Sequence, residues 1–394
     1  MKATFFYDIR FMKYNGKYYS HYGVNDSLMQ RYIDIFGELT YFARNEIITN
    51  ENKRYLTDEN KITKFKVITF NENWYGLKTK IKEVLNNTEF AIIRLPSFAG
   101  CIAQKECEKM NIPYLVEVVG NSFEALWYHS LKTKLIAIPV HFIMKKTIKN
   151  SKFVSYITND YLQKCYPTKN TTFNGISNVS LKLDNNIIDK RLEKINNTKL
   201  RYKKIINIGM IGALTVKYKG HVTAIKALKL VKEKYPNIKL KFLGQGRNKH
   251  LENICSKYGL KQNVEFCGSL PGGKPVMDWL DNIDIYIQPS ITEGHGRSVV
   301  EAISRGCITF SSNAGGLVDS VNKKYLFKKR DYAKLADFIL KAIEDEEFAE
   351  EVIKTEYNNI KKYDSKIIEK KRKESIQKVI EYYTNEENKS ETKI

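Results

Sequence analysis

Two glutamates, Glu293 and Glu301, lie eight positions apart in the segment PSITEGHGRSVVEAISRGCITFSSNAGG, residues 289–316. A tight glycine turn, residues 294–296, stands between them and opens a predicted helix over residues 297–304. A helix that starts at such a turn presents unpaired backbone N–H groups and the positive end of its dipole. Both features suit a phosphate group.

Glu301 lies about one turn into this helix, so its side chain can point back toward a ligand at the first residues. A carboxylate repels phosphate, but it accepts hydrogen bonds from the hydroxyl groups of a sugar. Phosphate and hydroxyl groups occur together in a nucleotide sugar, and the segment therefore predicts a site for one.

The same segment resembles the glutamate-x7-glutamate signature of retaining glycosyltransferases of family 4, which have the two-domain GT-B fold. His295 replaces the usual aromatic residue of the signature. The resemblance continues through residues 210–220 and 240–270, and thinly through residues 92–97, 114–121 and 174–176. The positions that match the signature are Pro289, Ser290, Glu293, Gly294, Gly296, Glu301, Ala302, Gly306, Gly315 and Gly316.

The resemblance implies a role for each matching residue. Lys219 would hold the diphosphate, Glu293 the hydroxyls of the donor sugar and Glu301 the ribose, with Glu293 and Lys219 as the catalytic pair. The expected donor-binding residues are Gly212, Lys219, Gly244, Gly246, Glu293, Gly294, His295, Gly296, Arg297, Ser298 and Glu301. His295 could contact the donor or only fill the aromatic position.

One departure from the family pattern concerns the positively charged residue that, together with the lysine, holds the diphosphate in relatives. Relatives have an arginine six positions before the lysine, whereas this chain has Ala213. Lys217 or Arg247 could supply the charge, the helix dipole could replace it, or donor binding could be weaker.

The order of predicted elements, strand then loop then helix, favours parallel sheets covered by helices. We therefore expect two α/β domains, since 394 residues are too many for a single hydrophobic core. The resemblance implies that they are Rossmann-like domains of the GT-B type, with their parallel sheets facing each other across a cleft. The expected divisions are an acceptor-binding domain over 1–183, a linker over 184–204, a nucleotide-sugar domain over 205–364, and a tail over 365–394. Within the linker, residues 187–195 could form a helix. That tail would be a helix that crosses back to the first domain, followed by a disordered end.

The expected strands of the first domain cover residues 3–7, 65–70, 90–95, 114–119, 152–158 and 171–173, with helices over 74–85 and 102–110. A long loop over residues 8–23, rich in tyrosine, would bind acceptor sugars by stacking or act only as a lid. Its aromatic residues are Tyr14, Tyr18, Tyr19 and Tyr22.

Net charge, apolar runs and cysteine content indicate what kind of partner the protein binds and where it lies in the cell. The net charge of +22 suits a partner such as nucleic acid, anionic lipid or a phosphorylated substrate. It could also reflect an AT-rich genome that favours lysine and asparagine, with the charge on solvated faces. No nucleic-acid motif is present, which favours a membrane surface. No apolar run approaches the roughly 20 residues of a membrane span, and the six cysteines form no paired motif. We expect a cytoplasmic protein, peripheral at the inner face of the cell membrane, with reduced core cysteines.

Residues 131–153 contain a short apolar stretch between lysines, which predicts either a core helix broken at Pro139 or an interfacial helix. Asp281 and Asp284 only superficially resemble a D-x-D metal motif, and Lys219 with the helix dipole can neutralise a diphosphate. No metal or other cofactor is therefore expected.

The predicted function is a retaining, metal-independent hexosyltransferase of capsule or exopolysaccharide synthesis. It would move a sugar from a nucleotide-sugar donor to a glycan or polyprenyl-diphosphate-linked glycan. Two alternatives stay open: a non-catalytic partner subunit of glycosyltransferase type, which Ala213 favours, and a nucleotide-sugar epimerase of the same fold.

Overall fold

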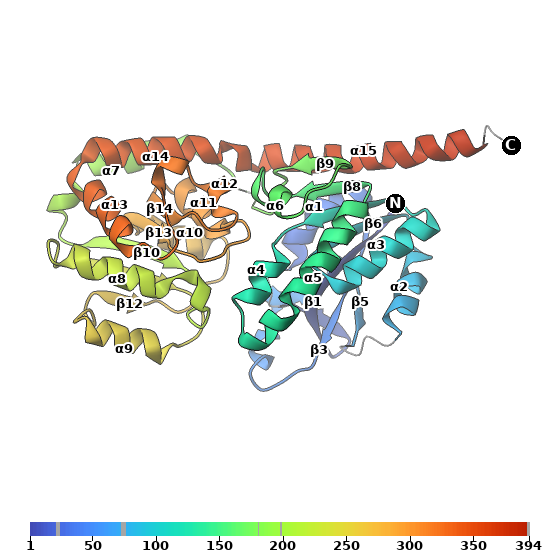
Figure 1. Ribbon diagram of the computed structural model, residues 1–394, viewed down its shortest axis with the longest axis horizontal. Helices are drawn as coiled ribbons and strands as arrows, with labels where there is room; N and C mark the ends of the chain where they lie inside the picture. The colour runs from blue at the N-terminus through green and yellow to red at the C-terminus, as the bar shows by residue number, and fades with distance from the viewer. Residues whose placement is uncertain (21–23, 72–75, 180, 198, 392–394) are drawn as a thin grey trace. The chain divides into compact units, whose positions relative to one another are not determined.

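The computed structural model describes residues 1–20, 24–71, 76–179, 181–197 and 199–391 (Figure 1). The chain divides into two compact units. Unit 1 comprises Met1–Phe123, Ile138–Ile176 and Glu369–Ile394, and unit 2 comprises Glu124–Ala137 and Ser177–Ile368.

Unit 1 is built on a nine-stranded sheet. Seven strands are parallel, in the order β5 (Lys66–Phe70), β3 (Glu38–Glu46), β1 (Lys2–Tyr14), β6 (Phe90–Leu95), β7 (Tyr114–Val118), β8 (Phe153–Tyr156) and β9 (Thr171–Asn174). The short strands β2 (Lys17–Tyr19) and β4 (Lys61–Ile62) add an antiparallel extension to the end of β1. The central strands β6 and β7 are buried along their whole length, as strands of a parallel sheet covered on both faces are.

The helices between residues 26 and 165 are α1 (Asp26–Phe36), α2 (Leu77–Leu85), α3 (Phe98–Met110), α4 (Ser122–Trp127), α5 (Leu131–Asn150) and α6 (Tyr161–Cys165). Most of α4 and the start of α5 belong to unit 2, since that unit includes Glu124–Ala137. Helix α3 begins where it does because Ser97 Oγ accepts the N–H of Gly100 at 2.8 Å. The Asp8 carboxylate accepts the N–H groups of Phe98 and Ala99 as well. The start of helix α3 is therefore fixed against the middle of β1.

Unit 2 contains a six-stranded parallel sheet. Its order is β12 (Val264–Phe266), β11 (Ile238–Leu243), β10 (Ile206–Ile211), β13 (Ile285–Gln288), β14 (Ile308–Ser312) and β15 (Leu326–Phe327). The helices are α7 (Asn185–Asn197), α8 (His221–Lys232), α9 (Lys249–Lys257), α10 (Lys274–Asp281), α11 (Arg297–Ser304), α12 (Leu317–Ser320), α13 (Tyr332–Glu344) and α14 (Glu346–Ile360). The apolar faces of these elements share one core.

The last helix, α15 (Ser365–Glu391), runs from unit 2 into unit 1. Ile368 packs in the core of unit 2, and Ile376, Val379 and Tyr383 pack in that of unit 1. The expected disordered end is wrong as far as Glu391, where the helix stops, and residues 392–394 lie outside the described residues.

Two further expectations need correction. The expected linker over 184–204 contains α7, because Ile188 and Ile195 give that helix an apolar stripe that packs into unit 2. The contact boundary falls after Ile176 rather than after residue 183.

The expected tyrosine-rich loop over 8–23 is largely strand. Strand β1 continues to Tyr14, and β2 follows after the turn at Asn15 and Gly16, which both have left-handed φ. Tyr14 belongs to β1, Tyr18 and Tyr19 belong to β2, and Tyr22 lies outside the described residues.

No helix in the described part of the chain is long and apolar enough to cross a membrane. All six cysteines lie among the described residues and none forms a disulfide; four of them are buried.

Candidate functional site

The loops at the carboxyl ends of β10, β11, β13 and β14 form one edge of unit 2, where open parallel sheets bind ligands. Their glycines permit close packing between loops. A Cβ on Gly244 would stand 2.1 Å from the Gly212 carbonyl oxygen, and one on Gly246, whose φ is +96°, would stand 2.9 Å from Thr215. The glycines expected to approach a ligand therefore have a packing role as well.

Lys219 and Glu293 form an ion pair at this edge. Lys219 Nζ lies 2.7 Å from Glu293 Oε2, and the two side chains keep 21% and 16% of their exposure. Gly220 places the lysine, because its φ of +86° and its contact with the Pro289 carbonyl oxygen leave no room for a Cβ. Thus the K-G pair after β10 and the glutamate after β13, distant in sequence, meet in space.

A series of hydrogen bonds between polar side chains leads from the interior of unit 2 to the Glu293 carboxylate. Ser290 Oγ lies 3.3 Å from Glu293 Oε2 and accepts from Gln288 Nε2 at 2.8 Å. Gln288 Oε1 accepts from the Tyr286 hydroxyl at 2.8 Å and from Ser298 Oγ at 3.4 Å. Burial raises the pKa of Tyr286, which keeps its hydroxyl a donor.

Sequence reasoning did not assign a role to Tyr286 or Gln288. A signal was present, because Tyr286, Gln288 and Ser290 alternate along a strand that is otherwise apolar, and alternate residues share one face of a strand.

The N-terminus of α11 lies beside this series of hydrogen bonds. Gly296, with φ +75°, is its N-cap and offers no side-chain hydrogen bond. In the described structure the N–H groups of Arg297 and Ser298 have no hydrogen-bond partner, as expected for a first helical turn. These donors suit an anion.

Gly315 and Gly316 hold the turn that precedes α11. Gly316 N donates to the Glu293 carbonyl at 2.9 Å. A Cβ on Gly315 or Gly316 would stand 2.1 Å from the carbonyl oxygen of Glu293 or Gly294, respectively. The paired glycines therefore fix the backbone on which Glu293 and Gly294 lie.

His295 turns into the protein. Its ring is buried and packs edge-on against Tyr363, with centroids 5.0 Å apart, and burial lowers the pKa of His295 to about 3. The side chain fills the aromatic position of the motif. Only its backbone remains for a donor contact.

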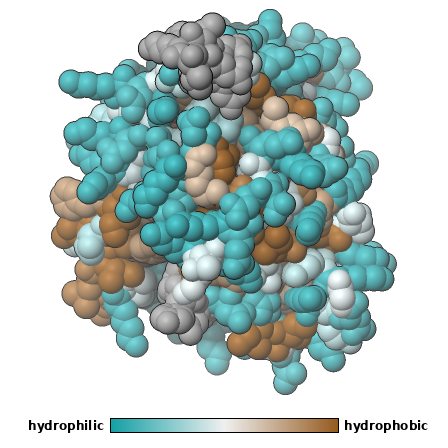
Figure 2. Space-filling model, turned by 90° about the vertical axis from the view of Figure 1, so that its right-hand side faces the viewer, coloured by the Kyte–Doolittle hydropathy of each residue, from teal (hydrophilic) through white to brown (hydrophobic). Residues whose placement is uncertain are grey.

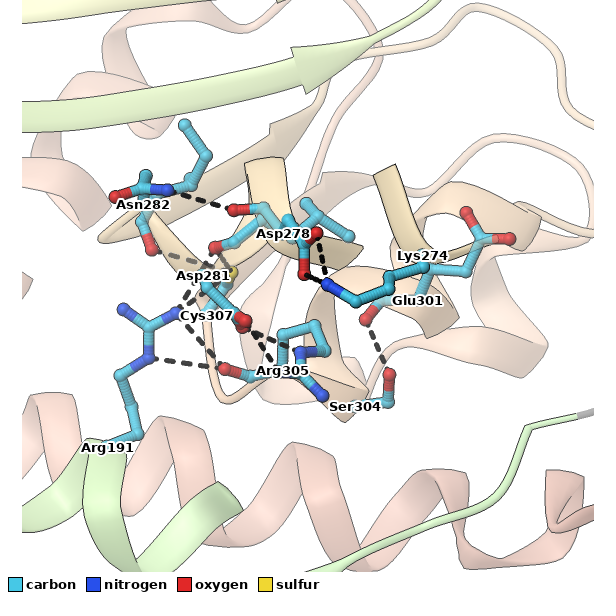
Figure 3. Close-up of polar contacts among 11 residues, drawn as sticks. Arg191, Lys274, Asp278, Asp281, Asn282, Glu301, Ser304, Arg305 and Cys307 are labelled. Carbon is cyan, nitrogen blue, oxygen red and sulfur yellow. Dashed lines mark hydrogen bonds and ion pairs between the residues drawn. The ribbon is translucent and has the colours of Figure 1, made fainter. Parts of the chain in front are cut away.

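Glu301 is partly buried, and its carboxylate has no hydrogen-bond partner among the described residues. Burial raises the pKa of Glu301, and the charge of Arg297 opposes the shift. Figure 3 shows the carboxylate directed away from the neighbouring Asp281–Arg305 ion pair. A desolvated carboxylate that the protein leaves without donors is a typical ligand-binding group.

The two aspartates of the superficial D-x-D resemblance form ion pairs with basic side chains. Asp281 pairs with Arg305 at 2.6 Å, and Asp284 pairs with Lys203 at 2.5 Å. Across the described residues no group of three or more His, Cys, Asp or Glu side chains could hold a metal ion.

Of the two cations that could replace the missing arginine, Arg247 pairs with Glu252 at 3.1 Å. Lys217 is exposed in the same 3-10 turn as Lys219, residues Lys217–Lys219. Lys217 is the better placed of the two, since it shares the loop of Lys219.

Unit 1 has a pocket of about 490 Å³ where β3 and β5 end. All its lining side chains except Ile47 are polar. They are Arg10, Asn45, Glu46, Thr49, Glu51, Asn52, Arg54, Tyr55 and Asn71. Asn45 Nδ2 donates to Asn71 Oδ1 at 3.3 Å, and Arg54 Nη2 donates to the Tyr55 hydroxyl at 3.0 Å.

Comparison with known proteins gives a consistent result. The family model described as "Glycosyl transferases group 1" matches residues 191–359. The chain is 36% identical to Protein CapJ of Staphylococcus aureus over 385 residues, which covers 95% of each chain. It is also 26% identical to the capsular polysaccharide biosynthesis glycosyltransferase CapM of the same species, over 45% of this chain and 46% of CapM.

Solved structures share the fold. HepE of Anabaena in complex with UDP matches with a TM-score of 0.67 at 15% identity, over 96% of this chain and 100% of HepE. Sucrose-phosphate synthase of Thermosynechococcus elongatus matches with a TM-score of 0.68 at 12% identity, over 97% of this chain and 100% of the synthase. The expected GT-B fold is confirmed.

Proposed function

Because the chain belongs to the group 1 glycosyl transferases, we propose that it moves a sugar from a nucleotide-sugar donor to a glycan or polyprenyl-linked glycan, with retention. The name of CapM, a similar protein, refers to capsular polysaccharide biosynthesis, and HepE, of the same fold, has been solved with UDP and with UDP-glucose. The HepE complexes support a uridine nucleotide as the first donor to test. The name of CapM supports a surface polysaccharide as the product.

The observation that carries this proposal is the Lys219–Glu293 pair at 2.7 Å beside the unpartnered N–H groups of α11. Lys219 and the N–H groups of Arg297 and Ser298 would bind the diphosphate. The carboxylate of Glu293 would hold Lys219 in position and accept hydrogen bonds from the donor sugar. Glu301, which the protein leaves without donors, would accept from the ribose hydroxyls.

The proposed reaction needs no further protein group. The bond between the anomeric carbon and the diphosphate oxygen breaks, and its electron pair leaves with the diphosphate. An acceptor hydroxyl forms the new bond from the same face, and its proton passes to the departing phosphate. Lys219 and the helix N–H groups would stabilise the charge that develops on the leaving oxygen, which is the main requirement for such a step.

The polar pocket of unit 1 is our candidate for the acceptor sugars. Its amides, carboxylates and guanidinium groups match the mixed donors and acceptors of sugar hydroxyls, and Tyr55 adds an aromatic face. This pocket replaces the tyrosine-rich loop that the sequence had suggested.

The test is to incubate the protein with a panel of UDP- and GDP-sugars and to measure nucleotide release and sugar epimerisation. A transferase releases nucleotide, and extracted polyprenyl-linked glycans accelerate the release. Epimerised donor without release would identify an epimerase. The absence of both nucleotide release and epimerised donor would indicate a non-catalytic partner subunit.

A further inference from the structure

Helix α5 is apolar on its buried side and on its outer side. Ala137, Val140, Met144 and Ile148 face the interior. The outer stripe is formed by Leu131, Leu135, Ile138 and Phe142, which follow one another at steps of four, three and four residues. The exposed fractions of Leu135, Ile138 and Phe142 are 83%, 53% and 62%.

Of the two alternatives for this segment, the core helix broken at Pro139 is wrong, because one helix of 20 residues runs through the proline. Pro139 lies on the outer side, as its exposure shows. The stripe therefore lies along one continuous helix, whose residues up to Ala137 belong to unit 2 and whose residues from Ile138 belong to unit 1.

A second apolar surface adjoins the helix within unit 1. A groove between α3 and α5 is lined by Phe98, Cys101, Ile102, Lys105 and Ile143, and all but the lysine are apolar. Ile143 is 43% exposed, although a large aliphatic side chain gains free energy on leaving water. Contiguous apolar surface of this kind marks an interaction site. Figure 2 shows one face of the molecule, on which hydrophobic residues gather in patches among hydrophilic ones.

The charged residues of α5 itself and of its sequence neighbours have one sign. Residues 125–159 contain six lysines and no acidic residue. Lys145, Lys146 and Lys149 follow the apolar stripe at the C-terminal end of the helix, and no ion pair involves them within the described structure. Lys132 lies at the other end and is exposed.

We propose that the outer face of α5 docks on an anionic lipid bilayer, with Leu135, Ile138 and Phe142 in the interface and the lysines among the headgroups. An exposed apolar stripe bordered by lysines suits this mode of binding, because the side chains enter the interface while the lysines contact anionic headgroups. A second copy of the chain is a poorer occupant, because pairing two such faces would bring like charges together. The inference rests on the helix alone and goes beyond the proposed transfer reaction.

The test is a flotation assay of the full chain with vesicles of phosphatidylcholine mixed with phosphatidylglycerol, and with vesicles of phosphatidylcholine alone. We expect binding to the anionic vesicles at low salt and release at roughly 0.5 M salt, where the Debye length is only a few ångströms.

Two triple variants separate the contributions. Leu135→Gln with Ile138→Gln and Phe142→Gln removes the apolar stripe, and Lys145→Gln with Lys146→Gln and Lys149→Gln removes the charge. Each should lower the vesicle partition coefficient by about tenfold or more. Lys249→Gln with Lys257→Gln and Lys261→Gln removes the same charge from exposed positions at α9 and should leave binding unchanged.

Circular dichroism establishes that each variant is folded, and nucleotide release without vesicles should be equal in all of them. Wild-type protein that stays unbound, or equal binding by all variants, would overturn the proposal. Self-association that the apolar variant abolishes, without vesicle binding, would identify a second copy as the occupant instead. Failure of nucleotide release would count against the transfer reaction and leave the vesicle result standing.

Discussion

At the scale of the residue, the distinctive feature is a pair of glutamates with different surroundings. Glu293 has a lysine and a serine within hydrogen-bond reach. Glu301 has no donor in the described structure, and burial raises its pKa. The protein positions the first carboxylate and gives the second no donor in its described part.

We predict that Glu301→Ala weakens nucleoside diphosphate binding by about 1.5–3 kcal/mol, the usual contribution of a hydrogen bond to a charged group. For the wild type, affinity should fall as the pH is lowered through the raised pKa of Glu301, because a protonated carboxyl accepts fewer hydrogen bonds. Calorimetric titration measures both effects. Unchanged affinity in the variant would refute the ribose assignment.

Glu356 gives a prediction about stability. It is buried in α14, where it accepts the N–H of Asn322, and burial raises the pKa of Glu356 to about 8. Since the folded state holds this proton more tightly than the unfolded state, stability should fall as the pH rises from the ordinary glutamate value to about 8.

Glu356→Gln should flatten that slope, with a gain on the order of a few kcal/mol near the upper end. Thermal unfolding across the pH range measures it. Glu350→Gln, in the same helix but paired with Lys354, is the matched control and should not flatten the slope. Parallel slopes for wild type and Glu356→Gln would contradict the assignment.

At the scale of the element, the glycine turns decide where the site's side chains stand. Gly315→Ala should destabilise unit 2 by at least about 1–3 kcal/mol, because φ is positive and the new Cβ would meet the Glu293 carbonyl. Calorimetric unfolding should show a lower melting temperature than for Gly272→Ala, whose Cβ meets nothing within 4 Å. Equal melting temperatures would mean that the turn is not held as described.

The elements that could be predicted from the sequence are those that are uniformly apolar or that have glycine or proline at their ends. Strand β6 has the predicted bounds 90–95, and helix α11 has the predicted bounds 297–304. Strand β3 was missed because its sequence, ELTYFARNE, mixes charged with aromatic residues, although it pairs with β1 on one side and β5 on the other.

The site was predictable to the level of its motif but not of its contacts. The signature identified Glu293 and Lys219 separately, yet 74 positions separate them, and local spacing carries no information about their ion pair. The inward turn of His295 was equally hidden, because it depends on Tyr363 in a distant part of the chain. Tertiary packing decides both.

At the scale of the whole molecule, we predict that the reaction proceeds without a metal ion. Nucleotide release should persist in EDTA, because Lys219 and the first turn of α11 would neutralise the diphosphate. The measurement is release with and without chelator, followed by addition of Mg²⁺ or Mn²⁺. Activity that chelation removes and a metal restores would show that the protein cations are insufficient.

The most direct test of the central claim, that the site at the edge of unit 2 performs sugar transfer, compares nucleotide release by the wild type and by Glu293→Ala with the preferred donor. The account predicts a loss of roughly 100-fold or more in the variant, the scale expected when a group that stabilises the transition state is removed. Glu265→Ala, which alters an exposed glutamate on β12, should release nucleotide at the wild-type rate. Equal rates for the wild type and Glu293→Ala would contradict the account.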